Sequence, residues 1–309
     1  IADSADQAEL NFFETRSSGN TLGFHFNLNH KDPRMRAIFQ DKNFRIALSL
    51  AMNRQEAIDV ILVGQGAPMN NAMDPNSIPE LYDEEMATQY TEHDPELAAE
   101  YLAKAGITEK GSDGFYLGPD GEPFSFVVQT TPAFGHVDIA DMVVNQWRAF
   151  GINAQLNSMD RALLYTRKDS SEHDVHVWGA GGGSEVFLDP RHFLPVTSES
   201  AYAMAWYTWY VNPTGTGALT PPEEPPAAVQ RQMELYDQIK ATGDYQQQLE
   251  LMKEILAIAK DEFYVIGISS SLPGYGIVRD NFHNVPTSMP GSWQYPDPAP
   301  TNPEQYWME

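Results

Sequence analysis

The hydrophobic positions of this chain follow two periods in turn, one typical of strands and one typical of helices. Residues 21–29 place an apolar side chain at every second position, which predicts a half-buried strand. From residue 42 the apolar positions recur every three or four residues, and residues 139–150 repeat this helical spacing. A buried strand is expected again over residues 263–269. Strands alternating with helices indicate an α/β fold.

Polar and turn-forming residues mark the ends of several expected elements. Asn53 is expected to cap a helix, with Glu56 as its capping-box partner. The sequence Gly-Pro-Asp-Gly-Glu-Pro at 118–123 has strong turn chemistry and lies between two apolar runs. We therefore expect a hairpin that pairs residues 115–117 with residues 124–128.

Charge and composition narrow the possible functions. The chain of 309 residues holds 43 acidic residues against 19 Lys and Arg, a formal net charge of -24. Such a surface repels phosphate backbones and anionic lipids, so we expect neither nucleic acid nor membrane as a partner. The absence of cysteine excludes disulfides, thiolate nucleophiles and cysteine-ligated metals. No apolar run approaches the ~18–20 residues of a membrane helix, and no cofactor or metal is predicted.

Two pairs of residues were considered for chemistry other than binding. His173 and His176 are three residues apart at the edge of an expected strand, which would place them on opposite faces. We interpret them as surface histidines and not as metal ligands. Glu185 and Asp189 could form the carboxylate pair of a glycosidase. A hydrolase acting on peptides or glycans is therefore the alternative of a different class, although the chain is expected not to be an enzyme.

Several short motifs occur in an order that resembles a known family. The stretches FHFNLN at 24–29 and FRIALSLAMNRQE at 44–56 resemble the FN…VRQALSYAIDRE signature of family 5 extracellular solute-binding proteins, the oligopeptide- and dipeptide-binding type of ABC importers. Ile46 and Asn53 depart from that signature. Residues 64–68 match its G-x-A-x-P, and residues 94–106 match its DPEKAKxLLxEAG helix. The resemblance covers roughly residues 20–286.

The resemblance implies a periplasmic-binding-protein-like lobe of the class II or cluster C type, with a mixed sheet flanked by helices and an incomplete first lobe. Residues 1–19 would be a remnant of the first lobe or a linker. Residues 20–265 would form the second, ligand-binding lobe, and residues 266–309 a return segment to the first lobe followed by a C-terminal tail. A complete protein with a shortened first lobe is the alternative.

The implied function is that of the substrate-binding component of an ABC importer. It would capture an oligopeptide-like solute between two lobes and deliver it to a membrane permease, acting as a monomer. The implied location is periplasmic or on the extracellular face of the cytoplasmic membrane, with a lipid anchor in the full-length protein. The first residues, Ile1-Ala-Asp-Ser, have neither the basic nor the apolar region of a signal peptide, so we expect the export signal to be encoded upstream.

The most site-like stretch follows the strand expected at 175–178. Small residues there leave the backbone accessible, and their amides can donate to a ligand. The stretch resembles the family's ADYxDP segment, whose Asp pairs with the amino group of a peptide. The matching position here is Val186, one residue after Glu185, which weakens the expected ammonium anchor. The predicted ligand-binding residues of this stretch are Trp178, Gly181, Gly182, Glu185, Phe187 and Asp189.

An aromatic segment at 201–210 is the second candidate. Trp206 and Trp209 offer flat apolar faces that could stack on sugar rings, whereas core packing is the alternative. If the segment is a strand, Trp206 and Tyr207 face opposite ways. The aromatic residues and the weakened ammonium anchor favour an oligosaccharide, and the family resemblance favours an oligopeptide.

Overall fold

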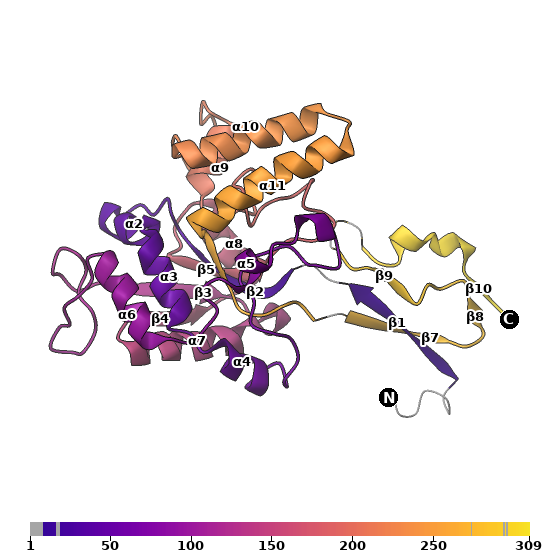
Figure 1. Cartoon of the computed structure of the whole chain (residues 1–309), viewed down its shortest axis with the longest axis horizontal. Helices are drawn as coiled ribbons and strands as arrows, with labels where there is room; N and C mark the ends of the chain where they lie inside the picture. Colours follow the sequence, from indigo (N-terminus) through magenta and orange to yellow (C-terminus); the bar gives the residue numbers. More distant parts are fainter. Residues whose placement is uncertain (1–8, 17–18, 273, 293, 295) are drawn as a thin grey trace.

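The fold has a larger body built on a five-stranded sheet and a smaller sheet that projects from one end of it (Figure 1). The computed structural model describes residues 9–16, 19–272, 274–292, 294 and 296–309. The larger sheet has the strand order β4-β3-β5-β2-β6. Its strands are β2 (Asn20–Phe26), β3 (Phe126–Thr130), β4 (Ala154–Ser158), β5 (Val175–Ala180) and β6 (Val265–Gly267).

The larger sheet is mixed, with parallel pairs on one side of β5 and antiparallel pairs on the other. β3 pairs in parallel with β4 and with β5, as parallel strands joined by crossover helices do. β2 pairs antiparallel with β5 and β6, with Phe24 opposite Val177 on one side and Ile266 on the other. The crossover helices are α7 (His136–Phe150) and α8 (Arg161–Asp169). The mixed sheet flanked by helices that the sequence predicts is confirmed.

The strand β2 is buried on both faces, so the prediction of a half-buried strand was wrong. Phe24 and Phe26 have no exposed surface, and His25, on the opposite face, is 1% exposed. A central strand with other elements on both sides has no wet face. On one side Trp147 of α7 packs against Phe24 at 5.1 Å between ring centroids, and its indole N–H donates to the carbonyl of Leu48 at 2.9 Å.

Helices surround the larger sheet, and their starts follow the expected capping chemistry. Asn53 accepts a hydrogen bond from the Glu56 amide at 3.1 Å, as predicted. The return bond of the capping box is replaced, because the Asn53 amide donates to the side chain of Gln146 at 3.0 Å. The remaining helices are α2 (Pro33–Gln40), α3 (Lys42–Leu50), α4 (Arg54–Val60), α5 (Glu84–Thr88), α6 (Pro95–Lys104), α9 (Met204–Val211), α10 (Ala227–Ala241) and α11 (Tyr245–Glu262).

Two expected elements differ in the structure. The hairpin is reduced to a turn with one isolated bridge between Leu117 and Pro123, because β3 begins at Phe126 and pairs with β4 and β5. The turn itself is held by Arg34, which pairs with Asp120. The aromatic segment 201–210 is a loop followed by helix α9, so the strand considered for it is excluded.

Two buried arginines of the FRIALSLAMNR motif join distant parts of the larger body. Arg45 donates to the carbonyls of Glu262 at 2.7 Å and Phe263 at 3.0 Å, where α11 ends. Arg54 donates to the carbonyl of Gly267 in β6 at 2.9 Å and to the Ser49 carbonyl at 2.9 Å. Burial lowers the pKa of Arg45 to about 10 and that of Arg54 to about 9, which leaves both charged at neutral pH.

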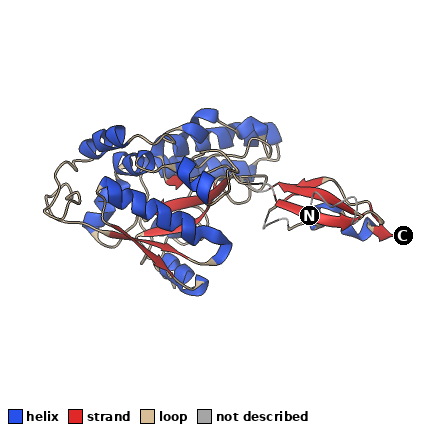
Figure 2. Cartoon of the chain, turned by 90° about the horizontal axis from the view of Figure 1, so that it is seen from below, coloured by secondary structure: helices blue, strands red, loops and turns tan. Residues whose placement is uncertain are grey.

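The smaller sheet is formed by segments from both ends of the chain (Figure 2). β1 (Leu10–Arg16) lies between β7 (Gly274–Arg279), which is antiparallel to it, and β9 (Ser288–Pro290), which is parallel. β8 (Phe282–His283) pairs with β10 (Trp307–Met308) beside it. Short 3-10 turns complete the fold at Pro79–Leu81, Ala133–Gly135, Ala299–Thr301 and Pro303–Gln305. Among the described residues, none of the helices is both long and apolar enough to span a bilayer.

Replacement of Arg54 should destabilise the fold strongly. In Arg54→Met, the Gly267 carbonyl and the Ser49 hydroxyl lose the guanidinium that donates to them inside the protein, and we expect the free energy of unfolding to fall by about 3 kcal/mol. Urea unfolding followed by tryptophan fluorescence measures this change. Arg231→Met is the matched control, because Arg231 lies on the surface of α10, and it should stay within about 0.5 kcal/mol of the wild type. Equal unfolding midpoints for the two variants would contradict the role of Arg54.

Candidate functional site

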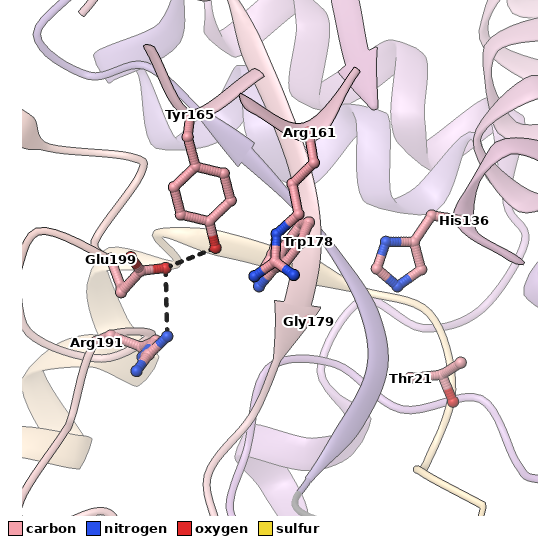
Figure 3. Close-up of a pocket in the computed structure, with 8 residues that line it drawn as sticks. All are labelled: Thr21, His136, Arg161, Tyr165, Trp178, Gly179, Arg191 and Glu199. Carbon is pink, nitrogen blue, oxygen red and sulfur yellow. Dashed lines mark hydrogen bonds and ion pairs between the residues drawn. The ribbon is translucent and has the colours of Figure 1, made fainter. Parts of the chain in front are cut away.

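A pocket of about 490 Å³ lies at the edge of the larger sheet where its parallel strands end. The connections after β3 and β5 leave in different directions, and a crevice at the carboxyl ends of such strands is a common ligand site in α/β folds. We call it the strand-end pocket. Its lining residues are Thr21, His136, Arg161, Tyr165, Trp178, Gly179, Arg191 and Glu199 (Figure 3).

Aromatic rings and a guanidinium group form one wall of the strand-end pocket. Trp178 and Tyr165 lie edge to face, with ring centroids 5.4 Å apart. Arg161 places its guanidinium carbon 5.0 Å from the centroid of Trp178 and 5.3 Å from that of Tyr165. Asp160 fixes the start of α8, because it accepts the Ala162 amide at 2.8 Å. The wall therefore offers flat apolar surface together with a cation.

An ionic network lies at another side of the pocket. The carboxylate of Glu199 accepts the Tyr165 hydroxyl at 3.0 Å and lies 3.4 Å from Arg191 (Figure 3). It also lies 3.4 Å from Lys168. The Lys168 side chain is only 2% exposed and also pairs with Asp169 at 3.1 Å. Burial, followed by the charge of Glu199, raises the pKa of Tyr165, so its hydroxyl remains a donor at neutral pH. The network fixes several polar groups in one orientation.

A layer of buried imidazoles lies beneath the pocket. His25 and His176 are paired across β2 and β5, with ring centroids 6.3 Å apart, and His192 lies 5.4 Å from His25. His25 Nε2 donates to the Gly179 carbonyl at 3.1 Å, which ties the layer to the pocket wall. Burial lowers the pKa of His25 to about 4 and that of His176 well below its ordinary value. The layer is therefore uncharged at neutral pH.

The prediction that His173 and His176 are surface histidines was wrong. They are 0% and 2% exposed, and their rings are 5.9 Å apart, not on opposite faces. His173 precedes the start of β5, so the alternation of a strand does not apply to it. Its Nε2 donates to the Ala201 carbonyl at 2.7 Å. Within the described ranges, no group of three or more His, Cys, Asp or Glu side chains is placed to hold a metal ion.

Among the predicted site residues, Trp178 lines the strand-end pocket, whereas Gly181 and Gly182 contact the loop at residues 71–73. The Gly181 amide donates to the Asn71 side chain at 2.8 Å, and the Gly182 amide donates to the Ala72 carbonyl at 3.2 Å. A Cβ on Gly182 would lie 2.6 Å from the sulfur of Met73. These small residues let two loops of the protein approach each other closely.

The acidic candidates of the same stretch lie in packed or ion-paired positions. Glu185 is 9% exposed, and Val186, where the resemblance expects an Asp, is fully buried in the core. The Asp189 side chain is 6% exposed and pairs with Arg191. The strand-end pocket therefore has no carboxylate from the ADYxDP-like segment among its lining residues.

The aromatic candidates line no part of the strand-end pocket. Trp206 is 4% exposed, and Trp209 is partly buried against the core. Phe187 also packs on the core, with its ring 6.0 Å from that of Tyr245. In this structure these rings pack within the larger body, which is the alternative that the sequence left open for Trp206 and Trp209.

Most residues of the strand-end pocket were not predicted from the sequence, although a signal for them exists. His136, Arg161 and Tyr165 all lie within a few residues of the end of a parallel strand, β3 or β4. Side chains at the carboxyl ends of parallel strands converge at one edge of a sheet. The segments at 131–136 and 159–165, which follow two such strands, are therefore where pocket residues are expected. Helix α8, with Asp160 as its cap, was not predicted, and without it Arg161 and Tyr165 have no common face.

Comparison with known proteins agrees with this fold. A family model described as bacterial extracellular solute-binding proteins, family 5 middle, matches residues 1–203, more than half of the chain. The fold is that of solute-binding proteins of the periplasmic-binding type, and the predicted fold class is confirmed. This chain belongs to the family 5 bacterial extracellular solute-binding proteins.

Individual relatives cover different parts of the chain. The "Di/tripeptide-binding protein 1" of Pseudomonas aeruginosa is 28% identical over 178 residues, which are 57% of this chain and 29% of that protein. The "Periplasmic alpha-galactoside-binding protein" of Rhizobium meliloti is 22% identical over 264 residues, 83% of this chain and 36% of that protein. The solved structure of "oligopeptide-binding protein OppA" superposes with a TM-score of 0.81 at 28% identity, over 99% of this chain and 50% of that one. The chain thus spans about a third of the length of these curated relatives.

The buried imidazoles should make stability fall in mild acid. Burial lowers the pKa of His173 to about 4, whereas a histidine in the unfolded chain titrates near 6.5. Between these values the unfolded chain binds protons that the folded chain does not, so stability decreases as pH falls from about 6.5 to about 4. His173→Gln should reduce this slope by up to about 1.4 kcal/mol per pH unit.

Urea unfolding at several pH values measures the slope. The exposed His93 offers the control, because His93→Gln removes an imidazole that is not buried. Since glutamine can still donate to the Ala201 carbonyl, the His173 variant is expected to fold. A slope in His173→Gln equal to that of His93→Gln would show that His173 does not titrate as described.

Proposed function

We propose that this chain supplies one wall of the ligand site in the substrate-binding component of an ABC importer. That component captures an oligopeptide-like solute between two lobes and delivers it to a membrane permease. The observation that carries the proposal is the strand-end pocket, where Trp178, Tyr165 and Arg161 converge beside the Glu199 network. The family is extracellular or periplasmic, and we propose a lipid anchor in the full-length protein.

The proposed division into lobes follows the two bodies of the fold. Residues 20–265 would be the second lobe, whereas residues 1–19 and 266–309 would belong to the first lobe and its connections. The smaller sheet supports this division because Tyr275 and Ile277 are 68% and 42% exposed, and it carries an apolar hollow of about 590 Å³ beside β7 and β10. Exposed apolar surface of this kind is typical of an interface that further chain covers.

An oligopeptide is favoured over an oligosaccharide as the solute. One of the two arguments for sugar was the pair Trp206 and Trp209, and neither lines the strand-end pocket. The other, the weakened ammonium anchor, still favours sugar. The relative named for di- and tripeptides is also more similar than the one named for alpha-galactosides, at 28% against 22% identity. Trp178 still offers a flat face for a sugar ring, so an oligosaccharide is the second candidate.

The carboxylates considered for hydrolysis do not support an enzyme. Asp189 accepts hydrogen bonds from Arg191, from the Thr197 hydroxyl at 3.4 Å and from the Gln294 amide at 3.2 Å. These contacts and the small exposed fraction of the Asp189 side chain, 6%, leave its carboxylate little access to a substrate. Binding is the chemistry that the pocket supports.

Calorimetry with this chain tests the proposal. We expect a tripeptide to bind with a Kd of about 0.1–1 mM, because one wall supplies only part of the contacts that a closed site would make. Arg161→Ala should weaken the peptide at least about fivefold. Leu163→Ala is the control, since Leu163 is exposed on the same helix outside the pocket. A submicromolar Kd would contradict the proposal that this chain supplies only one wall of the ligand site. Tighter binding of a trisaccharide than of the tripeptide would overturn the choice of solute.

A further inference from the structure

A second hollow, of about 350 Å³, lies where the larger body meets the smaller sheet. We call it the seam hollow. The larger body contributes side chains from two loops, and β9 contributes the opposite side. Its lining residues are Asn76, Ser77, Ser184, Ser288, Met289 and Pro290. None of these side chains is charged, in contrast to the strand-end pocket with its two arginines and one glutamate.

Hydrogen bonds to Asp74 fix the residues of the larger body that line the seam hollow, Asn76 and Ser77. Asp74 accepts the Asn76 amide at 3.1 Å and the Ser77 hydroxyl at 2.8 Å. Its own amide donates to the Gly182 carbonyl at 2.8 Å, which fixes this loop beside the segment that carries Ser184. The close approach of the two loops at Gly182 therefore forms one side of the hollow.

The other side is fixed by the smaller sheet. Ser288 lies opposite Glu14 in the parallel pairing of β9 with β1, and the Glu14 amide donates to the Thr287 carbonyl at 2.9 Å. Met289 is 2% exposed, which leaves Ser288 as the partly exposed polar side chain of β9 at the hollow. Hydroxyl and amide groups from both bodies thus meet around one space.

We propose that the seam hollow is a second subsite for the same solute and takes a neutral hydrogen-bonding group, such as a peptide backbone unit. This inference rests on the proposed function. Hydroxyl and carboxamide side chains both donate and accept hydrogen bonds, whereas an ionic group would meet no counter-charge among the lining residues. The strand-end pocket holds charged or aromatic parts of the solute, and the seam hollow holds an uncharged part.

The chain geometry sets the length of solute that reaches both sites. Gly179 lines the strand-end pocket and Ser184 lines the seam hollow, five residues further along the chain. An extended chain of five residues spans at most about 18 Å. A peptide of about six residues is therefore long enough to reach both hollows even at this upper limit.

The seam hollow also differs from the strand-end pocket in what it connects. The strand-end pocket is lined by the larger body alone, at residues 21–199, whereas the seam hollow is lined by both bodies. Only a ligand with contacts on both bodies favours one arrangement of them over another. Occupancy of the seam hollow would therefore be the event that couples binding to the relative position of the two bodies.

The experiment compares tri-alanine with hexa-alanine on this chain by calorimetry at millimolar peptide. We expect hexa-alanine to bind at least about tenfold more tightly than tri-alanine, from two or more additional hydrogen bonds. Ser184→Phe, at an exposed position, fills the seam hollow and should abolish this advantage while leaving tri-alanine binding unchanged. Ser112→Phe, on the exposed turn near residue 113, is the matched control and should keep the advantage.

The outcomes separate this inference from the proposed function. If tri-alanine binds and depends on Arg161 but hexa-alanine has no advantage, or keeps it in Ser184→Phe, the seam subsite is refuted and the proposed function stands. If neither peptide binds, the peptide function fails and the peptide subsite fails with it. The same measurements with linear tri- and hexasaccharides show which neutral group the seam hollow binds. If only the sugars bind more tightly when longer, and Ser184→Phe removes that gain, the subsite takes sugar hydroxyls and the proposal of a peptide backbone unit is overturned.

Discussion

The larger body depends on one kind of interaction, in which buried guanidinium groups donate to backbone carbonyls far away in the sequence. Arg45 and Arg54 reach the end of α11 and strand β6, more than 200 residues further along the chain. Carbonyls at the end of a helix have no partner within that helix, and a planar group with five donors satisfies several of them at once. These bonds fix β6, the strand that closes the larger sheet beside β2, against α3 and α4.

The position of the ligand site follows from that closure. Once β6 and β2 complete the sheet beside β5, the carboxyl ends of the three parallel strands open on one edge, where Trp178 and the start of α8 meet. Beneath this edge the imidazoles of His25 and His176 are kept neutral by burial. The charges in the pocket therefore come from its rim and not from its floor, which leaves Arg161, Arg191 and Glu199 to set its electrostatic character.

The sequence predicted the class of fold, the order of most elements and one residue of the pocket, for physical reasons. Local periodicity and caps such as Asn53 depend on neighbours within a few residues, and they were predicted largely correctly. The hairpin at 115–128 was wrong because β3 pairs with strands that are distant in sequence. His173 was misinterpreted for a related reason: its burial is set by a distant segment at Ala201, and no local pattern reveals it. The contact of Gly182 with Ala72 is equally non-local.

The close packing at Gly181 has a consequence for how such a protein can diverge. The loop at residues 71–77 and the loop after β5 approach so closely that a methyl group on Gly181 would lie 2.8 Å from the backbone carbonyl oxygen of Ala72. A change of backbone in one loop therefore requires a matching change in the other. Over evolutionary time the two should vary as a linked pair, while exposed positions such as Ser184 and Arg161 remain free to drift toward new solutes.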